Sequence, residues 1–186
     1  MENPSLDLRG VVKSITEPRS ADVILANVDK YFTKDAVIVH PLLNSVPRLG
    51  REGLKGSYRM LRALTLGNRI EFHTVAFDRV VVRHGREKQV ALLDLTEHLQ
   101  LRFLPLPYSV SPVLHIRFLV RVDMEKGDDD LWYITRQEDN LPTDYGSSGP
   151  ILPVPGLVTL SNYFKWALGT GTFYTARIIT ALGLFK

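Results

Sequence analysis

The sequence contains no cysteine among its 186 residues. This absence excludes disulfides, thiolate metal sites and a cysteine nucleophile. The N-terminal residues Met1 to Ser5 contain neither a basic segment nor an apolar run. They therefore do not resemble a secretory signal, and we expect a cytoplasmic or nuclear location. No spacing resembles a metal site, a phosphate-binding loop or a nucleophile elbow, so neither a metal nor a cofactor is predicted.

Acidic residues are missing from the last part of the chain, because no Asp or Glu follows Asp144. The basic residues of that part are Lys165, Arg177 and Lys186, and they account for the whole formal net charge of +3. Recognition of nucleic acid requires basic residues gathered on one face. Three separated cations do not form such a face, so nucleic acid is not expected as a partner.

The remaining composition is that of ordinary globular material, with 45% hydrophobic and 23% charged residues. A chain of this length has room for one domain with its own core. We divide it into an N-terminal segment without a dominant period (1–17), an α+β domain (18–140), a linker rich in proline and glycine (141–156) and an apolar, basic helical tail (157–186).

Two amphipathic helices are predicted near the N-terminus. Apolar residues at spacings of three and four place the first over 20–32 and the second over 51–66, where Gly67 ends it. Between the two helices, the sequence predicts a strand over 36–39 that the pair His40–Pro41 stops.

Alternation of apolar and polar residues predicts an antiparallel sheet after the second helix. One face of the sheet is apolar and the other polar, so helices are expected to cover one face only. The predicted strands are 69–77, 79–84, 88–103, 113–123 and 131–139. The strand over 88–103 is long enough to require a bend or a bulge.

Three segments, Tyr31–Pro41, Glu71–Asp78 and Trp132–Asp139, carry a family resemblance. With the order of elements, they resemble the nuclear transport factor 2-like (NTF2-like), or SnoaL-like, superfamily, and within it the fungal SigF-like subgroup. The resemblance covers about residues 20–140 and implies an α+β cone fold. In that fold a curved antiparallel sheet carries the N-terminal helices on its concave face, and an extra apolar helix is expected at the C-terminus. The superfamily includes isomerases, cyclases, dehydratases, hydrolases and binding modules, so the fold does not supply the chemistry.

Glu97 is the ionisable residue on the apolar face of the strand over 88–103. A carboxyl group in an apolar interior is desolvated and its pKa rises, which suits a general acid or base. His40 is a candidate proton shuttle, and Tyr31 completes the predicted catalytic set. Two alternatives remain for Glu97: a buried pair with Arg136, or an outward position set by a bulge. For His40 the alternative is a structural hydrogen bond to a backbone carbonyl.

Further residues are expected to line a ligand pocket inside the cone. They are His73, Phe118, Trp132 and Arg136. Glu138 and Asp139 point to opposite faces of the last strand, so they cannot act as one carboxylate pair. One of the two is a candidate to join Glu97.

The tail carries apolar residues at alternating spacings of three and four, which predicts a helix with one apolar stripe. Its predicted contacts with a membrane or a partner are Phe164, Lys165, Trp166, Tyr174, Arg177, Ile178 and Phe185. Aromatic and basic residues without acids favour an interfacial helix on an anionic membrane or a lipid droplet. Only 11 residues separate Lys165 from Arg177, whereas a membrane span needs roughly 20 apolar residues. The alternatives are packing on the protein's own sheet and a homodimer seam.

Three hypotheses for function follow from these features. The first is a non-enzymatic cone-fold protein with a pocket for an apolar small molecule, attached peripherally to a membrane or lipid surface by residues 157–186. The second is a small SnoaL-like acid–base enzyme of the isomerase, cyclase or hydro-lyase type, with Glu97 as the base and an apolar substrate. The third is a dimeric scaffold that uses the polar sheet face.

Overall fold

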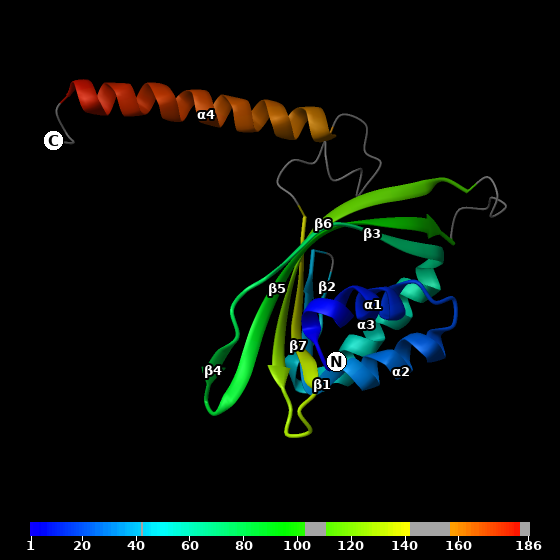
Figure 1. Ribbon diagram of the computed structural model, residues 1–186. Helices are drawn as coiled ribbons and strands as arrows, with labels where there is room; N and C mark the ends of the chain where they lie inside the picture. The colour runs from blue at the N-terminus through cyan, green and yellow to red at the C-terminus, as the bar shows by residue number, and fades with distance from the viewer. Residues whose placement is uncertain (42, 103–110, 142–156, 183–186) are drawn as a thin grey trace.

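In a computed structural model of the chain, a curved sheet carries three helices on one side, and a fourth helix lies apart from them (Figure 1). The structure describes residues 1–41, 43–102, 111–141 and 157–182. The architecture is the α+β cone expected from the sequence, with the N-terminal helices on the concave face. Most of the loop expected after residue 103 and of the linker over 141–156 lies outside the described residues.

Helix α1 (Pro4–Thr16) is a helix that the sequence analysis did not predict. Asn3 caps its first turn, because the Asn3 side chain accepts a hydrogen bond from the Ser5 backbone N–H at 3.1 Å. Pro4 occupies the first turn, where a missing N–H leaves no bond unmade. The buried stripe of the helix consists of Leu8, Val11 and Ile15. Residues 1–17 therefore contribute to the core.

Helices α2 (Ala21–Tyr31) and α3 (Gly50–Leu64) confirm the two predicted helices. The short 3₁₀ turn η1 (Pro47–Leu49) leads into α3. Helix α2 buries Ile24 and Val28, and helix α3 buries Leu54 and Tyr58. Burying one large apolar side chain contributes about 1.5–3 kcal/mol, so these stripes anchor both helices in the core.

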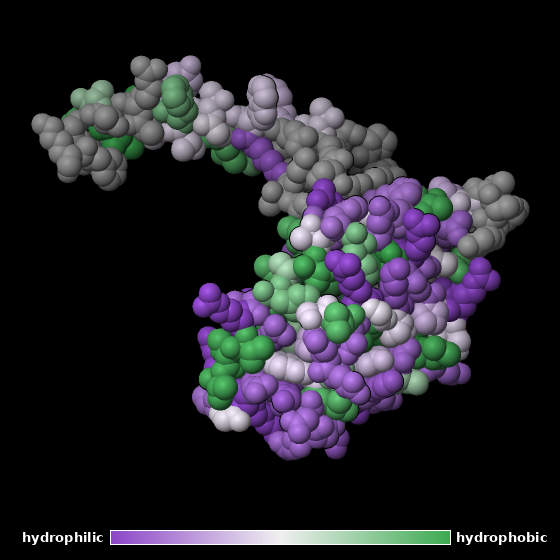
Figure 2. Space-filling view, in the orientation of Figure 1, coloured by the Kyte–Doolittle hydropathy of each residue, from purple (hydrophilic) through white to green (hydrophobic). Residues whose placement is uncertain are grey.

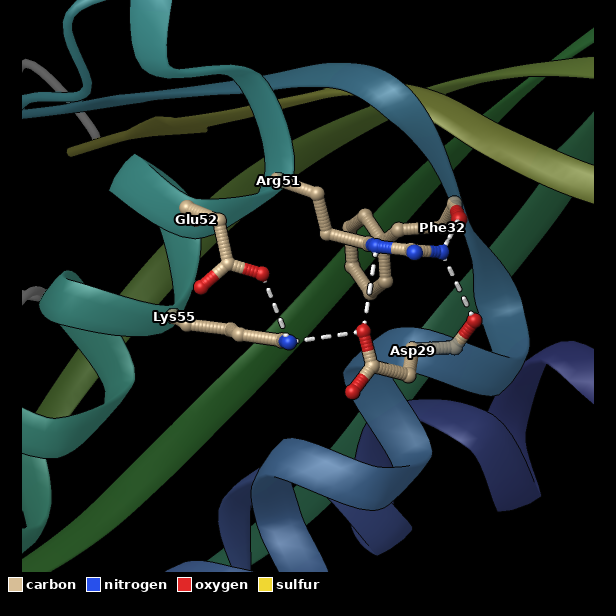
Figure 3. A network of polar contacts seen from close by, with 5 residues as sticks. All are labelled: Asp29, Phe32, Arg51, Glu52 and Lys55. Atoms are coloured by element: carbon tan, nitrogen blue, oxygen red, sulfur yellow. Dashed lines mark hydrogen bonds and ion pairs between the residues drawn. The ribbon is translucent and has the colours of Figure 1, made fainter.

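Helices α2 and α3 are joined by a polar network around Arg51 (Figure 3). Nη1 of Arg51 donates to the backbone carbonyl oxygens of Asp29 at 2.9 Å and Phe32 at 3.0 Å, and Nε lies 3.1 Å from the Asp29 carboxylate. Lys55 adds ion pairs of 2.7 Å with Asp29 and 2.8 Å with Glu52. The last carbonyls of a helix lack partners within it. Arg51 supplies partners there and so fixes the point where α2 ends.

The strands are β1 (Phe32–His40), β2 (Leu43–Asn44), β3 (Thr65–Phe77), β4 (Val81–Arg83), β5 (Arg86–Leu101), β6 (Val113–Lys126) and β7 (Trp132–Asn140). Their order across the sheet is β2-β1-β7-β6-β5-β3, and β4 pairs with β5. The sheet is mixed rather than purely antiparallel, because β1 runs parallel to β7. An alternating pattern shows on which face of the sheet a side chain lies, but not the direction of the strand. The sequence therefore did not distinguish parallel from antiparallel pairing.

Register shifts lie in β1, β3 and β7, while the long strand β5, for which a bend or a bulge was expected, pairs with β6 without a bulge. In β7 the extra residue is Thr135, which stands between Ile134 and Arg136, while the partners of these two in β6 are consecutive. A one-residue bulge reverses the alternation of side chains beyond it. It therefore turns Gln137 and Asp139 toward the concave face.

Helix α4 (Leu157–Ala181) confirms the expected C-terminal helix and stands away from the cone (Figure 1). Large apolar side chains along it are exposed, among them Trp166 at 81% and Tyr163 at 76%. Figure 2 shows apolar and weakly polar side chains along its length. Within the described ranges, no helix combines the length and apolarity that a membrane span requires.

Candidate functional site

A cavity of about 170 Å³ lies between the concave face of the sheet and helices α1 and α3. Most of the residues around it are apolar, such as Ile15, Leu95 and Val120. The polar residues that line it are Thr16, His40, Ser57, Tyr58, Glu97, Gln137 and Asp139. An apolar cavity of about 150 Å³ is known to hold benzene. This cavity therefore has room for a compact ring compound.

A chain of hydrogen bonds crosses the cavity from α3 to β7. The Tyr58 hydroxyl donates to Oε1 of Gln137 at 2.9 Å. Nε2 of Gln137 in turn donates to both carboxylate oxygens of Asp139, at 3.0 and 3.1 Å. Tyr58 reaches β7 because it stands on the buried face of α3, and the bulge at Thr135 brings the other two residues to meet it.

Glu97 enters the cavity from β5, where it alternates with buried apolar residues. Part of its side chain remains accessible, but its Oε1 is buried and has no hydrogen-bond partner among the described residues. Burial, together with the nearby charge of Asp139, raises the pKa of Glu97 from 4.5 to about 8. Glu97 therefore keeps its proton at neutral pH.

Asp139 is the second carboxyl group of the cavity and is 9% exposed. Burial raises its pKa from 3.8 to about 7, while the hydrogen bond from Gln137 opposes the rise because it stabilises the charged form. Both carboxyl groups of the cavity therefore titrate near neutral pH, Glu97 above Asp139.

Two further titratable groups face the cavity. Burial lowers the pKa of His40, so its imidazole is neutral at pH 7. The His40 ring packs at 5.7 Å from the ring of Phe118. Burial also raises the pKa of Tyr58 well above its usual value of 10, with the charges of Asp139 and Glu97 as further causes. Tyr58 therefore acts through a neutral hydroxyl.

Of the residues predicted for the site, Glu97, His40 and Phe118 line the cavity together. Tyr31 does not reach it, since its ring lies at the end of α2 with the Lys30 ammonium 5.1 Å above it. His73 was also placed wrongly. Its Nε2 lies 2.8 Å from Oγ1 of Thr96, which faces outward because the neighbouring Glu97 faces inward.

Trp132 and Arg136 were expected in the pocket and lie elsewhere. Trp132 is buried at the start of β7, where its carbonyl accepts a hydrogen bond from the Met1 amino group at 2.9 Å. The bulge at Thr135 turns Arg136 outward, where it donates to Glu138 at 2.8 Å. Arg136 is therefore not the buried partner that the sequence analysis considered for Glu97.

Three cavity residues were missed or left undecided by the sequence analysis. Tyr58 was assigned only to the apolar face of the second helix. Gln137 was not singled out, and Asp139 was one of two alternatives. The signal that would have found Gln137 and Asp139 is the position of the bulge, which single-sequence alternation does not contain. The described residues include no group of three or more His, Cys, Asp or Glu side chains that could hold a metal ion.

The predicted contacts of the tail lie on α4, with the exception of Phe185, which is outside the described residues. Phe164, Trp166, Tyr174 and Ile178 are all exposed. These side chains are therefore not packed on the protein's own sheet in this structure.

The curved sheet, the concave-face helices and the cavity between them define an NTF2-like cone protein. The chain belongs to the SigF NTF2-like domain family, whose model matches residues 1–184. The match includes α1 and α4, beyond the range of about 20–140 that the resemblance covered. No curated protein matches the sequence.

Solved structures with the same fold are distant in sequence. An NTF2-like superfamily protein from Salmonella enterica serovar Typhimurium has a TM-score of 0.56 at 14% identity, covering 73% of this chain and 85% of its own. A cystatin-like fold protein from Nostoc punctiforme has a TM-score of 0.55 at 12% identity, covering 80% and 93%. ActVI-ORFA from Streptomyces coelicolor has a TM-score of 0.51 at 13% identity, covering 74% and 96%. At these identities the likeness concerns the fold alone.

Proposed function

We propose that the cavity binds a compact, neutral and mainly apolar small molecule and exchanges a proton with it. The observation that carries this proposal is the pair of carboxyl groups, Asp139 and Glu97 with its buried Oε1, in a mainly apolar cavity of about 170 Å³. A neutral molecule is favoured because an anion would meet the charge of Asp139, and a cation would lose its water in an apolar environment.

The two carboxyl groups suit opposite roles. With pKa values of about 7 and about 8, Asp139 is the group that accepts a proton and Glu97 the group that donates one. Carboxyl groups whose environments separate their pKa values are a recurring acid–base arrangement. It suits isomerisation, cyclisation or loss of water. In this assignment Glu97 is the acid rather than the base expected from the sequence.

The carboxyl pair also favours an enzyme over a protein that only holds a ligand. An apolar ligand needs no buried carboxyl groups, and a buried carboxyl costs stability when it ionises. Groups with strongly shifted pKa values gather at active sites. The acid–base hypothesis therefore accounts for Glu97 and Asp139, whereas a purely apolar pocket leaves them unexplained.

A general base in the cavity can be tested before the substrate is identified. The protein is incubated in D₂O with 1-indanone, a compact bicyclic ketone, and NMR follows deuterium exchange next to the carbonyl. We expect exchange above the buffer rate, and a loss of about a hundredfold in Asp139→Asn, the lower range of general-base contributions. Glu138→Gln is the matched control, because Glu138 is adjacent and faces outward. Exchange that is equal with and without the protein, or unchanged in Asp139→Asn, would contradict the proposal.

A second proposal concerns α4, which we assign to peripheral attachment on a lipid surface. It is supported by exposed Trp166, Tyr163 and Phe164 and by the absence of acids after Asp144. Aromatic and aliphatic side chains with nearby cations suit the interface of an anionic bilayer.

Flotation with vesicles tests this attachment in the full chain. We expect wild-type protein to float with anionic vesicles, and a variant with Phe164→Ser, Trp166→Ser and Ile178→Ser to remain at the bottom of the gradient. Val82→Ser, at a valine that is 70% exposed on β4, is the control and should float as wild type does. Failure of the wild type to float, together with a concentration-dependent dimer, would favour a homodimer seam instead.

A further inference from the structure

We infer that Gln137 is a positioning residue that couples the charge of Asp139 to the direction of the Tyr58 hydroxyl, and thereby selects between a hydroxyl and a carbonyl group on the ligand. The selection of a ligand rests on the proposed function. The coupling between the two side chains does not, because it concerns contacts within the chain.

The contacts define one state of this coupling, in which Asp139 is ionised. A carboxylate only accepts hydrogen bonds, so the amide of Gln137 must present its Nε2 to Asp139, at 3.0 and 3.1 Å. Its Oε1 then faces Tyr58 and accepts the hydroxyl proton at 2.9 Å. The Tyr58 oxygen can offer only its lone pairs to the cavity.

Protonation of Asp139 favours the opposite state. A neutral carboxyl group carries an O–H donor, which pairs best with the Oε1 of an amide that has turned by half a rotation. The amide then presents Nε2 to Tyr58, whose oxygen must accept. The Tyr58 O–H is released and turns toward the cavity. A half rotation of the Gln137 amide exchanges the positions of its oxygen and nitrogen. The distances from Gln137 to Tyr58 and to Asp139 are therefore the same in both states.

The groups around Gln137 make it the link between the two residues. The titratable groups of the cavity are His40 from β1, Tyr58 from α3, Glu97 from β5 and Asp139 from β7. Apart from these, α1, β3 and β6 contribute apolar side chains and Thr16. Within the described part of the chain, Gln137 is the hydrogen-bond partner of the Tyr58 hydroxyl. Asp139 also acts on Tyr58 through its charge, but this electrostatic effect does not exchange the donor and acceptor roles of the Tyr58 hydroxyl.

The coupling predicts the chemical class of the ligand in each state. When Asp139 is ionised, Tyr58 accepts, so the cavity favours an alcohol or enol hydroxyl. When Asp139 is neutral, Tyr58 donates, so the cavity favours a ketone or another carbonyl group. A proton exchanged with Asp139 thus changes the preferred form of the ligand. After a proton passes from a ketone to Asp139, the released Tyr58 O–H can donate to the enolate oxygen that forms.

The coupling can be measured without any ligand. The protein is labelled with ¹³C at Cζ of tyrosine and observed by NMR. The Tyr58 signal is assigned by its loss in Tyr58→Phe. Its chemical shift reports whether the hydroxyl donates or accepts a hydrogen bond. We expect a step in this signal near pH 7, where Asp139 titrates. The step should shrink to a small electrostatic shift in Gln137→Met, which keeps the shape without the amide, and should vanish in Asp139→Asn, which cannot ionise. The outward-facing control Glu138→Gln should retain it. Each of these proteins is also measured with Glu97→Gln added, because Glu97 lies in the same cavity and titrates in a neighbouring pH range.

Two results would overturn the coupling: a step of wild-type size in Gln137→Met, or a Tyr58 signal that stays constant while labelled Asp139 titrates in the wild type. If Gln137→Met does not fold, Gln137→Leu, which also lacks the amide, decides the first point. For the ligand, calorimetry compares 1-indanol with 1-indanone below and above pH 7. We expect the ratio of their dissociation constants to change about tenfold in the wild type, the effect of one hydrogen bond, and to stay constant in Gln137→Met. A constant ratio in the wild type overturns the selection. Absence of binding by both probes overturns the selection and the proposed function, while the ¹³C titration still decides the coupling.

Discussion

Glu138 and Asp139 are adjacent in β7 and lie on opposite sides of the sheet. Glu138 accepts a hydrogen bond from Arg136 on the outer face at 2.8 Å, whereas Asp139 accepts two from Gln137 inside the cone. The same type of functional group therefore meets water in one position and an apolar cavity in the next. Changes at Glu138 thus serve as matched surface controls for changes at the cavity.

Glu97→Gln should change how stability depends on pH. The folded pKa of about 8 lies above the ordinary 4.5, so the native state keeps a proton that the unfolded state loses over that interval. The free energy of unfolding of the wild type therefore falls as pH rises from about 4.5 to about 8. Glu97→Gln removes this loss, so above pH 8 the unfolding free energy of the variant should exceed that of the wild type by at most about 5 kcal/mol. Urea denaturation across this pH range measures the difference.

The control for this prediction is Glu138→Gln, which should leave the pH dependence unchanged and alter stability by at most about 1 kcal/mol. A different outcome would reveal a buried partner for Glu97. If Glu97→Gln lost several kcal/mol at every pH, Glu97 would be ionised in the native state and paired with a cation. The structure argues against this, because Arg136 is engaged with Glu138.

How far the sequence could predict the site is illustrated by Glu97 and Asp139. Glu97 was recognised because β5 keeps a regular alternation, so a lone carboxyl among buried leucines must face the concave side. The alternation of β7 is interrupted at Thr135. A simple period of two then places Arg136 inside and leaves Gln137 outside, the reverse of the structure. The cost of a bulge depends on neighbouring strands, and this information is not local to the segment.

The fold was more predictable than the site because periodicity reports which face is buried. Helices α2 and α3 and the long strands followed from their apolar spacing. The parallel pairing of β1 with β7 did not, since it depends on how distant segments meet. Helix α1 was missed although Leu8, Val11 and Ile15 are spaced by three and four, because other apolar residues obscure this short stripe.

Gly50 should be intolerant of a side chain, and Gly56 should not. Gly50 has a positive φ of 49°, and an added Cβ would overlap the carbonyl oxygen of Lys34. Gly50→Ala should therefore cost at least about 2 kcal/mol of unfolding free energy. Gly56 lies within the same helix with nothing within 4 Å of an added Cβ, so Gly56→Ala should stabilise by about 0.5–1 kcal/mol. Equal effects in thermal denaturation would contradict this account.

Arg51→Lys should weaken the junction between α2 and α3 (Figure 3). Lysine keeps the charge but not the planar guanidinium, which reaches two backbone carbonyl oxygens and the Asp29 carboxylate together. We expect a loss of about 1–3 kcal/mol in urea denaturation. Arg59→Lys, at an exposed arginine in the same helix, should stay within about 0.5 kcal/mol of the wild type. A similar small effect for both would mean that Arg51 contributes only a screened surface charge.

The role of α1 in the domain is tested by comparing Leu8→Ala with Leu6→Ala. Leu8 is fully buried, whereas Leu6, two residues earlier in the same helix, is 77% exposed. Truncating a buried leucine costs about 2–5 kcal/mol, and the exposed substitution should remain within about 0.5 kcal/mol of the wild type. Because Val12 and Ile15 of α1 line the cavity, Leu8→Ala should also weaken binding of 1-indanone. If residues 1–17 were a segment separate from the domain, both variants would unfold at the wild-type urea concentration and bind the probe equally. Only a helix that closes one side of the cavity makes the two leucines differ in both measurements.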